Sequence, residues 1–282
     1  MKIAIAQLNY HIGHFEKNFD KIKSAVANAV RLEADLVLFG ELAVCGYPPR
    51  DFLEFEDFIN KCDEVIEKIK PLTSNIAVVI GAPSKNPLAE GKDLFNSAYF
   101  IADGEIIGLA HKALLPTYDI FDEYRYFEPS KEFHTVKFKG KKIALTICED
   151  IWNLGDNPLY RQCPLDQLIG QHPDIILNLS ASPFDYTHLE DRKAILKQNV
   201  QKYKLPMIYC NAVGSQTEIV FDGGSLVMDA QANLIQQLPL FEESIRYVDW
   251  KADGRFAQPV LSSAAQLPNA EYSPAALEPE AS

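Results

Sequence analysis

Residues 141–152 read KKIALTICEDIW, a stretch in which a short hydrophobic run stops at a cysteine. The run covers residues 143–147, contains three β-branched residues and follows the polar turn KGKK, a pattern that predicts a buried strand. Cys148 therefore lies at the carboxyl end of a strand, directly before Glu149 and Asp150. Loops at such ends bind ligands in open α/β folds. This position makes Cys148 a candidate nucleophile, although a free cysteine is more often a buried apolar filler.

Further strands and helices are predicted along the rest of the chain. The other short apolar runs are IAIAQL, ADLVLF, IAVVIGA, SAYFIA, EIIGLA, DIILNLS, PMIYCN and SLVMDA. Helical periodicity is clearest over residues 17–33, 55–69 and 188–204, and it places Cys62 on the apolar face of the second helix. This alternation indicates an α/β fold, α+β in some classifications, with a mixed sheet covered by helices. Asp-Gly pairs at 103–104 and in FDGGSLVMD predict turns between strands.

Composition and charge narrow the class of protein. With 282 residues, of which 47% are hydrophobic, the chain can bury one substantial core. Its net charge of -12 and the lack of a long basic cluster argue against nucleic acid and anionic membranes as partners. The amino terminus is predicted to be a strand, not a signal peptide, and no apolar span of about 18 residues occurs. Five cysteines without a CxxC spacing indicate free thiols in a reducing cytoplasm and argue against a zinc site.

The composition changes after Trp250. Residues 251–282 contain eight alanines and four prolines with little periodic apolar pattern. Such a segment buries too little apolar surface to offset its ordering entropy. We therefore expect one domain over residues 1–250 and a linker or tail over residues 251–282.

Two more residues with catalytic chemistry follow predicted strands. Glu41 comes after ADLVLFG and Lys112 after EIIGLAH, as Cys148 comes after IALTI. Taken singly, Glu41 is more simply a surface acid and Lys112 a solvated side chain. If the three strands are neighbours, however, one edge of a sheet holds a carboxylate, an ammonium and a thiol together. The functional prediction depends on this joint placement.

These three groups suit acyl transfer at a carboxamide. Lys112 is expected to lower the pKa of Cys148 from its usual value of about 8.5 and, with a backbone N–H, to stabilise a tetrahedral oxyanion. Glu41 is expected to take the thiol proton, deliver it to departing ammonia and then activate water against the thioester. One carboxylate can serve both half-reactions.

Other candidate sites have weaker patterns. Cys45 is the rival thiol, but it ends no predicted strand and is read as packing near the site. The HxxH spacing of His11 and His14 is too weak to predict a metal site. The sequence has no GxGxxG fingerprint and no GxxxxGK[ST] loop, so no motif supports nucleotide binding.

Several motifs in this order resemble the nitrilase, or carbon-nitrogen hydrolase, superfamily over about residues 1–250. They are FGELAVCGYPPRD, HKALLPTYDIFDEYRYF, ICEDIW, NLSASPF and NAVGSQTEIVFDGGS. Within the superfamily, the chain is most similar to the glutaminase domains of glutamine-dependent NAD synthetases. The resemblance implies a four-layer αββα sandwich of two sheets between helix layers. It also implies a homo-oligomer, because such domains commonly pair through their helices.

The resemblance assigns roles to individual residues. It implies that Glu41 is the general base, Lys112 the oxyanion lysine and Cys148 the nucleophile, with Glu123 as a second glutamate that supports the site. Positions that line the glutamine pocket in the family match Tyr47, Tyr118, Phe121, Glu149 and Ser182. Hydrolysis by this set needs no metal or organic cofactor.

The resemblance also implies a partner. A complete NAD synthetase needs an ATP pyrophosphatase domain that uses ATP and Mg²⁺, and no motif in this sequence resembles one. We therefore expect the chain to hydrolyse L-glutamine and to pass ammonia to a synthetase domain, in cis or in trans, that amidates deaminated NAD. Two alternatives remain: a stand-alone amidase acting on another small carboxamide, and a catalytically silent scaffold for oligomerisation or docking.

The sequence departs from the family pattern after SASPF. The family usually continues to a Gly-Lys or Gly-Arg pair whose basic residue helps to hold the substrate, and the matching residues here are Thr187 and His188. Arg192, one helical turn further on, can replace the missing base if that helix face points inward. The alternative is that Arg192 is an ordinary solvated residue.

Overall fold

The computed structural model describes residues 1–154, 159–251 and 253–257. Its strands form two six-stranded sheets and a separate hairpin. In spatial order the first sheet contains β14 (Ser244–Asp249), β1 (Lys2–Gln7), β2 (Leu36–Leu38), β3 (Ala77–Lys85), β4 (Leu94–Ala102) and β5 (Glu105–His111). The second contains β13 (Leu234–Gln237), β12 (Leu226–Met228), β9 (Met207–Cys210), β8 (Ile175–Leu179), β7 (Lys141–Ile147) and β6 (Val136–Phe138). The hairpin consists of β10 (Val213–Gln216) and β11 (Ile219–Asp222).

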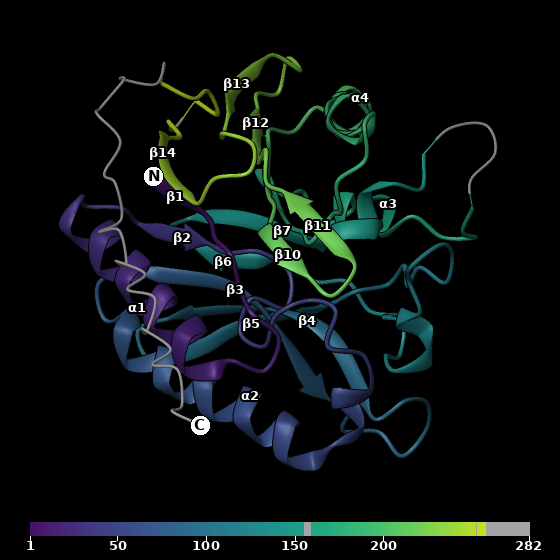
Figure 1. The fold of residues 1–282 in the computed structure, drawn as a ribbon. Coiled ribbons are helices and arrows are strands. Elements are labelled where there is room, and N and C mark those ends of the chain that lie inside the picture. Colours follow the sequence, from purple (N-terminus) through teal and green to yellow (C-terminus); the bar gives the residue numbers. More distant parts are fainter. Residues whose placement is uncertain (155–158, 252, 258–282) are drawn as a thin grey trace, which may run out of the picture.

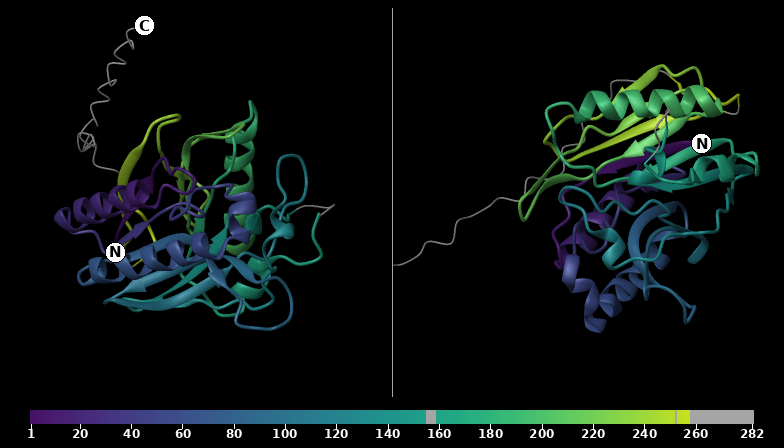
Figure 2. Two further views of the ribbon diagram at one scale, coloured as in Figure 1. Left: turned by 60° about the horizontal axis from the view of Figure 1, so that its bottom comes forward. Right: turned by 90° about the vertical axis from the view of Figure 1, so that its right-hand side faces the viewer.

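Helices cover the outer face of each sheet. The first sheet is covered by α1 (Phe15–Arg31) and α2 (Glu56–Ile69), and the second by α3 (Pro164–Ile169) and α4 (His188–Tyr203). Short 3₁₀ helices occur at η1 (Arg50–Glu54), η2 (Lys70–Thr73), η3 (Glu123–Arg125) and η4 (Cys148–Ile151). Figure 1 and the right-hand view of Figure 2 show α1 and α2 on one side, α4 on the other and the strands between them. This order confirms the αββα sandwich.

The apolar core is divided by the sheets into three clusters. Along β1, Ile3 and Ile5 point between the sheets while Ala4 and Ala6 point to the helices, as the two-residue period of a strand requires. The central strands of both sheets divide their side chains in the same way and are buried on both faces. This double burial explains why they appear in the sequence as continuous hydrophobic runs.

The predicted helices agree with the structure in position and in buried face. Helix α1 begins two residues earlier than predicted, after His14, whose ring accepts the Lys17 N–H at 3.5 Å. Helices α2 and α4 match the predicted ranges to within a residue at each end. Cys62 is fully buried on the inner face of α2, as predicted.

Both predicted Asp-Gly turns are present. Asp103 and Gly104 have φ values of 52° and 80° and join β4 to β5 in a two-residue hairpin. The second turn joins β11 to β12, and so connects the separate hairpin to the second sheet. A Cβ at Gly223 would lie 2.4 Å from the Gln7 amide nitrogen, so this turn requires glycine for space as well as for its φ of 72°.

The chain turns back on itself after β14. An isolated bridge pairs Trp250 with Phe256, and both side chains pack between the sheets. Most of the predicted linker or tail, residues 258–282, lies outside the described residues. Among the helices that the structure describes, none combines the length and the apolar character needed to cross a membrane.

Candidate active site

The three predicted catalytic residues come together, but from two sheets. Glu41 follows β2 and Lys112 follows β5 in the first sheet, whereas Cys148 follows β7 in the second. The prediction that three neighbouring strands carry them is therefore wrong: β3 and β4 separate β2 from β5, and β7 belongs to the facing sheet. The residues meet because the carboxyl ends of all three strands open on the same side of the sandwich.

Cys148 is the first residue of η4 and forms a sharp turn directly after β7. Its φ of 42° is in the left-handed region, which a non-glycine residue adopts only when the surroundings hold it there. The side chain is 8% exposed and belongs to the apolar cluster between the sheets. The turn therefore fixes the thiol at the end of its strand, beside the residues of the first sheet.

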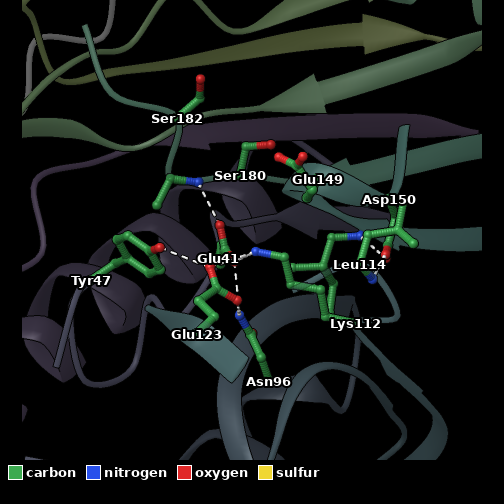
Figure 3. A network of polar contacts seen from close by, with 12 residues as sticks. Glu41, Tyr47, Asn96, Lys112, Leu114, Glu123, Glu149, Asp150, Ser180 and Ser182 are labelled. Atoms are coloured by element: carbon green, nitrogen blue, oxygen red, sulfur yellow. Dashed lines mark hydrogen bonds and ion pairs between the residues drawn. The ribbon is translucent and has the colours of Figure 1, made fainter. Parts of the chain in front are cut away.

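Lys112 is a fully buried cation held between two carboxylates. Its Nζ lies 2.7 Å from Glu41 Oε1 and 2.7 Å from Glu123 Oε1. Figure 3 shows the ammonium group pointing at both glutamates, with the Tyr47 hydroxyl on the far side of Glu123. That hydroxyl donates to Glu123 Oε1 at 2.8 Å. An ammonium has three N–H donors, so one remains for another acceptor.

Two groups that the sequence analysis did not identify complete the surroundings of Glu41. The Asn96 side-chain amide, from β4, donates to Glu41 Oε1 at 2.8 Å, and the Ala181 N–H, at the end of β8, donates to Oε2 at 3.0 Å. Gly81 allows the Glu41 loop to lie against β3, because a Cβ there would be 2.3 Å from the Leu42 nitrogen. Both carboxylate oxygens of Glu41 are therefore fixed in direction. A polar Asn96 in a buried strand was the only sequence signal.

The charges of this cluster set its protonation. Burial alone would lower the pKa of Lys112, but Glu123 and Glu41 raise it well above its usual range, so the group is an ammonium. Burial raises the pKa of Glu123 to about 7, although Lys112 opposes the rise. Burial and the Glu41 charge raise the pKa of Cys148 well above its usual range, and Lys112 only partly offsets them. Lys112 thus acts on the Cys148 pKa in the predicted direction, but the net shift of that pKa is upward because burial and the Glu41 charge outweigh the lysine.

The two acids after Cys148 have separate environments. Burial raises the pKa of Glu149, whose carboxylate accepts hydrogen bonds from Tyr118 at 3.0 Å and Tyr160 at 3.2 Å. Asp150 instead accepts backbone N–H groups, at 2.9 Å and 3.0 Å from the two residues after Lys112 and at 3.0 Å from Ile147. Neither Asp150 nor Tyr160 was predicted from the sequence to have a role in the site.

The remaining predicted pocket residues surround this cluster. Phe121 packs edge-on against Tyr118 at 5.6 Å between ring centroids. Together with Tyr47 and Glu123 it lines a cavity of about 310 Å³, of which Cys148 is not a lining residue. Ser182 is buried, its N–H donates to Asn211 Oδ1 at 2.8 Å, and its hydroxyl points away from Glu41 (Figure 3).

Arg192 and His188, at and near the positions that depart from the family pattern, both form contacts with other residues of the chain. Arg192 is fully buried, forms an ion pair with Asp222 and donates to the Gly223 carbonyl at 2.9 Å, so it is not the solvated residue of the alternative interpretation. Its guanidinium is occupied by these contacts. His188 Nδ1 lies 2.8 Å from the Pro183 carbonyl oxygen, so this ring nitrogen is occupied by the main chain.

The rival sites lack the same surroundings. Cys45 is fully buried, and its thiol lies 3.5 Å from the Gly46 carbonyl. In the part of the chain that the structure describes, no three His, Cys, Asp or Glu residues are grouped so that they could hold a metal ion.

Comparison with known proteins places this geometry in context. The chain matches the carbon-nitrogen hydrolase family over residues 2–255. It is 38% identical to a glutamine-dependent NAD(+) synthetase from Synechocystis sp. over 255 residues, which are 88% of this chain and 46% of that protein. The solved structure of the glutamine-dependent NAD+ synthetase from Acinetobacter baumannii superposes with a TM-score of 0.84 at 30% identity, over 94% of this chain and 48% of that one.

A smaller enzyme shares the fold at lower identity. The NitN amidase of Nesterenkonia sp. AN1 superposes with a TM-score of 0.77 at 21% identity, over 90% of this chain and 94% of that one. This chain therefore spans less than half of the two synthetases and most of the amidase in length.

Proposed function

Because this chain belongs to the carbon-nitrogen hydrolase family, we propose that it hydrolyses the side-chain amide of L-glutamine to glutamate and ammonia. Its 38% identity to a glutamine-dependent NAD(+) synthetase supports glutamine as the substrate. The observation that carries the proposal is the buried ammonium of Lys112, held by Glu41 and Glu123 next to a cysteine on a strained turn.

The first half-reaction forms a thioester. Glu41 takes the Cys148 proton while the sulfur attacks the amide carbon, since the raised pKa of the thiol makes a base necessary for this step. The oxyanion of the tetrahedral intermediate accepts the third N–H of Lys112. Glu41 then returns the proton to the amide nitrogen, the carbon–nitrogen bond breaks and ammonia leaves.

The second half-reaction releases the acid. Glu41 takes a proton from water, the resulting hydroxide attacks the thioester carbon, and Lys112 again stabilises the oxyanion. The carbon–sulfur bond breaks, the sulfur recovers its proton from Glu41 and glutamate leaves. Each proton that Glu41 takes is thus returned within the same half-reaction.

Glu123 serves to hold the lysine and not to transfer protons to the substrate. It shares the Lys112 ammonium with Glu41 and is itself fixed by the Tyr47 hydroxyl. With one ammonium between two carboxylates, protonation of Glu123 leaves the group of three neutral overall. The two glutamates therefore keep the Lys112 side chain in its charged form and hold it near the Cys148 thiol.

The other end of glutamine carries an ammonium and a carboxylate. We assign the ammonium to the Glu149 carboxylate, which the Tyr118 and Tyr160 hydroxyls orient. Phe121 and Ser182 are assigned to the walls of the same pocket. His188, which takes the place of the family's basic residue, is a weaker partner for the carboxylate than lysine or arginine, because an imidazole carries no permanent positive charge.

The ammonia is proposed to be consumed by a synthetase domain, in cis or in trans, that uses ATP and Mg²⁺ to amidate deaminated NAD. The synthetases of similar sequence support this, since each contains as much chain again as the part matched here. No metal or organic cofactor takes part in the hydrolysis itself. Homo-oligomerisation and a cytoplasmic location are part of the proposal, and free thiols at all five cysteines agree with the latter.

A stand-alone amidase is the second candidate, and His188 at the position of the basic residue is the observation that favours it. Ammonia release from glutamine, acetamide and propionamide, measured with and without an added NAD synthetase domain, separates the two. The proposal predicts that glutamine is turned over faster than either simple amide. Equal or faster turnover of the simple amides would instead support the second candidate.

A further inference from the structure

We propose that Asp150 is a positioning residue that fixes the distance between Lys112 and Cys148 across the two sheets. This inference rests on the proposed function, in which those two residues act on the same carbonyl group. Asp150 itself touches neither the lysine ammonium nor the proposed substrate carbon, and it acts through the backbone.

The contacts of Asp150 reach both sides of the site. Its Oδ1 accepts the N–H groups of Ala113 and Leu114 at 2.9 Å and 3.0 Å, and its Oδ2 accepts the Ile147 N–H at 3.0 Å. Ala113 directly follows Lys112, and Ile147 directly precedes Cys148. Figure 3 shows the carboxylate beside the backbone of Leu114, on the main-chain side of Lys112. One carboxylate therefore joins the backbone of the lysine to that of the nucleophile.

Packing alone does not determine this distance. The space between the sheets is filled by apolar side chains, and the hydrophobic attraction between them is not directional. Three hydrogen bonds to one buried carboxylate are directional and stronger than neutral ones. The Lys112 segment is also held by its own N–H on the Asn96 carbonyl at 2.8 Å and by the Ser130 N–H on its carbonyl at 3.0 Å. Among these hydrogen bonds, those of Asp150 connect the Lys112 segment to the second sheet, through the N–H of Ile147 at the end of β7.

The carboxylate is better suited to this task than an amide. Asp150 is 3% exposed and needs two acceptor atoms, because N–H groups face both of its oxygens. An asparagine has one oxygen and one NH₂ group. In either orientation of the amide, its NH₂ group therefore faces a backbone N–H that has lost its acceptor. Asp150→Asn therefore releases either the Lys112 side or the Cys148 side while keeping the shape of the residue.

The test compares Asp150→Asn with a control aspartate that accepts a backbone N–H from the opposite end of β7. Asp174 Oδ2 accepts the Lys142 N–H at 2.8 Å, at the opposite end of β7, so Asp174→Asn makes the same change of side chain far from the site. We expect Asp150→Asn to lower kcat for glutamine by about tenfold or more with KM within about threefold, since small misplacements of reacting groups have effects of this order. Asp174→Asn should leave both within about twofold of wild type.

A second readout does not depend on glutamine. The rate at which iodoacetamide labels Cys148, followed by peptide mass mapping, should fall in Asp150→Asn and in Lys112→Ala. If Asp150 acts through Lys112, adding Asp150→Asn to Lys112→Ala should change the labelling rate by less than about twofold. Effects that multiply would instead indicate a general structural role and overturn the inference.

The outcomes separate this inference from the proposed function. If wild type hydrolyses no amide, the proposed function fails, and the labelling comparison still decides the role of Asp150. If Asp150→Asn matches Asp174→Asn in kcat and labelling, the inference is wrong. If the asparagine variant does not fold, Asp150→Ser replaces it in both measurements, because the smaller side chain leaves room for a water molecule to accept the backbone N–H groups. If neither variant folds, Asp150 is required for the fold as a whole, and the claim that it tunes a folded enzyme is overturned.

Discussion

Replacement of Glu123 by glutamine tests the electrostatics of the site. Glu123 is 5% exposed, and burial raises its pKa to about 7 from an ordinary value of 4.5. Glutamine has the same shape, and its oxygen can still accept from Lys112 and Tyr47, but it does not ionise. Any pH dependence that Glu123 gives to stability should therefore disappear in Glu123→Gln.

The magnitude follows from proton linkage. The folded protein binds this proton more tightly than the unfolded chain does, so the contribution to stability is fully present below about pH 4.5 and is lost as the pH rises through about 7. The difference of about 2.5 pKa units, at about 1.36 kcal/mol each, corresponds to roughly 3 kcal/mol. Glu123→Gln should therefore gain roughly 3 kcal/mol relative to wild type between pH 4.5 and pH 8.

Urea denaturation of both proteins across this pH range measures the difference. Asp150, whose pKa is raised to about 6, titrates in both proteins, so its contribution cancels. Glu218→Gln is the control, because Arg50 lowers the pKa of that exposed residue to about 2 and its effect lies below the pH range used. A stability difference between Glu123→Gln and wild type that does not change with pH would refute the reasoning.

Three further substitutions test individual contacts. Asn96→Ala removes the amide donor at 2.8 Å from Glu41, and steady-state kinetics should show kcat lowered about tenfold, as expected for one hydrogen bond to a charged group. Arg192→Ala leaves Asp222 buried without its cation, so urea denaturation should show a loss of about 3–5 kcal/mol; a loss below about 1 kcal/mol would contradict a buried ion pair. Gly81→Ala places a Cβ against the backbone of the Glu41 loop, and turnover should fall together with a stability loss of about 1–3 kcal/mol.

The sequence patterns located the central strands, the longer helices and the central residues of the site, whereas the four layers were predicted only through the family resemblance. Double burial of strands leaves continuous apolar runs, and amphipathic helices leave a period of three to four residues, so both could be located. Lys112 and Cys148 could be placed because each follows an apolar run directly. Which strands are neighbours could not be predicted from the runs, since hydrophobicity reports burial and not strand order.

The residues that sequence patterns did not identify contact groups that are distant in the sequence or belong to the backbone. Asn96 lies in a strand without a motif of its own, and its partner Glu41 is 55 positions away. Asp150 was visible in the motif, but the donors to its carboxylate are backbone N–H groups, which every residue except proline has. The net shift of the Cys148 pKa could not be predicted because it depends on how burial and the Glu41 charge compare with the charge of Lys112. Such a balance requires the three-dimensional arrangement.

The central claim is that Cys148 attacks glutamine with the help of Lys112. Incubation with the glutamine analogue 6-diazo-5-oxo-L-norleucine, followed by intact-protein and peptide mass spectrometry, tests it most directly. The account predicts one adduct on Cys148 that is absent in Cys148→Ala, forms more slowly in Lys112→Ala and is blocked by excess glutamine. Labelling at another residue, or no labelling even when an NAD synthetase domain is added, would contradict it.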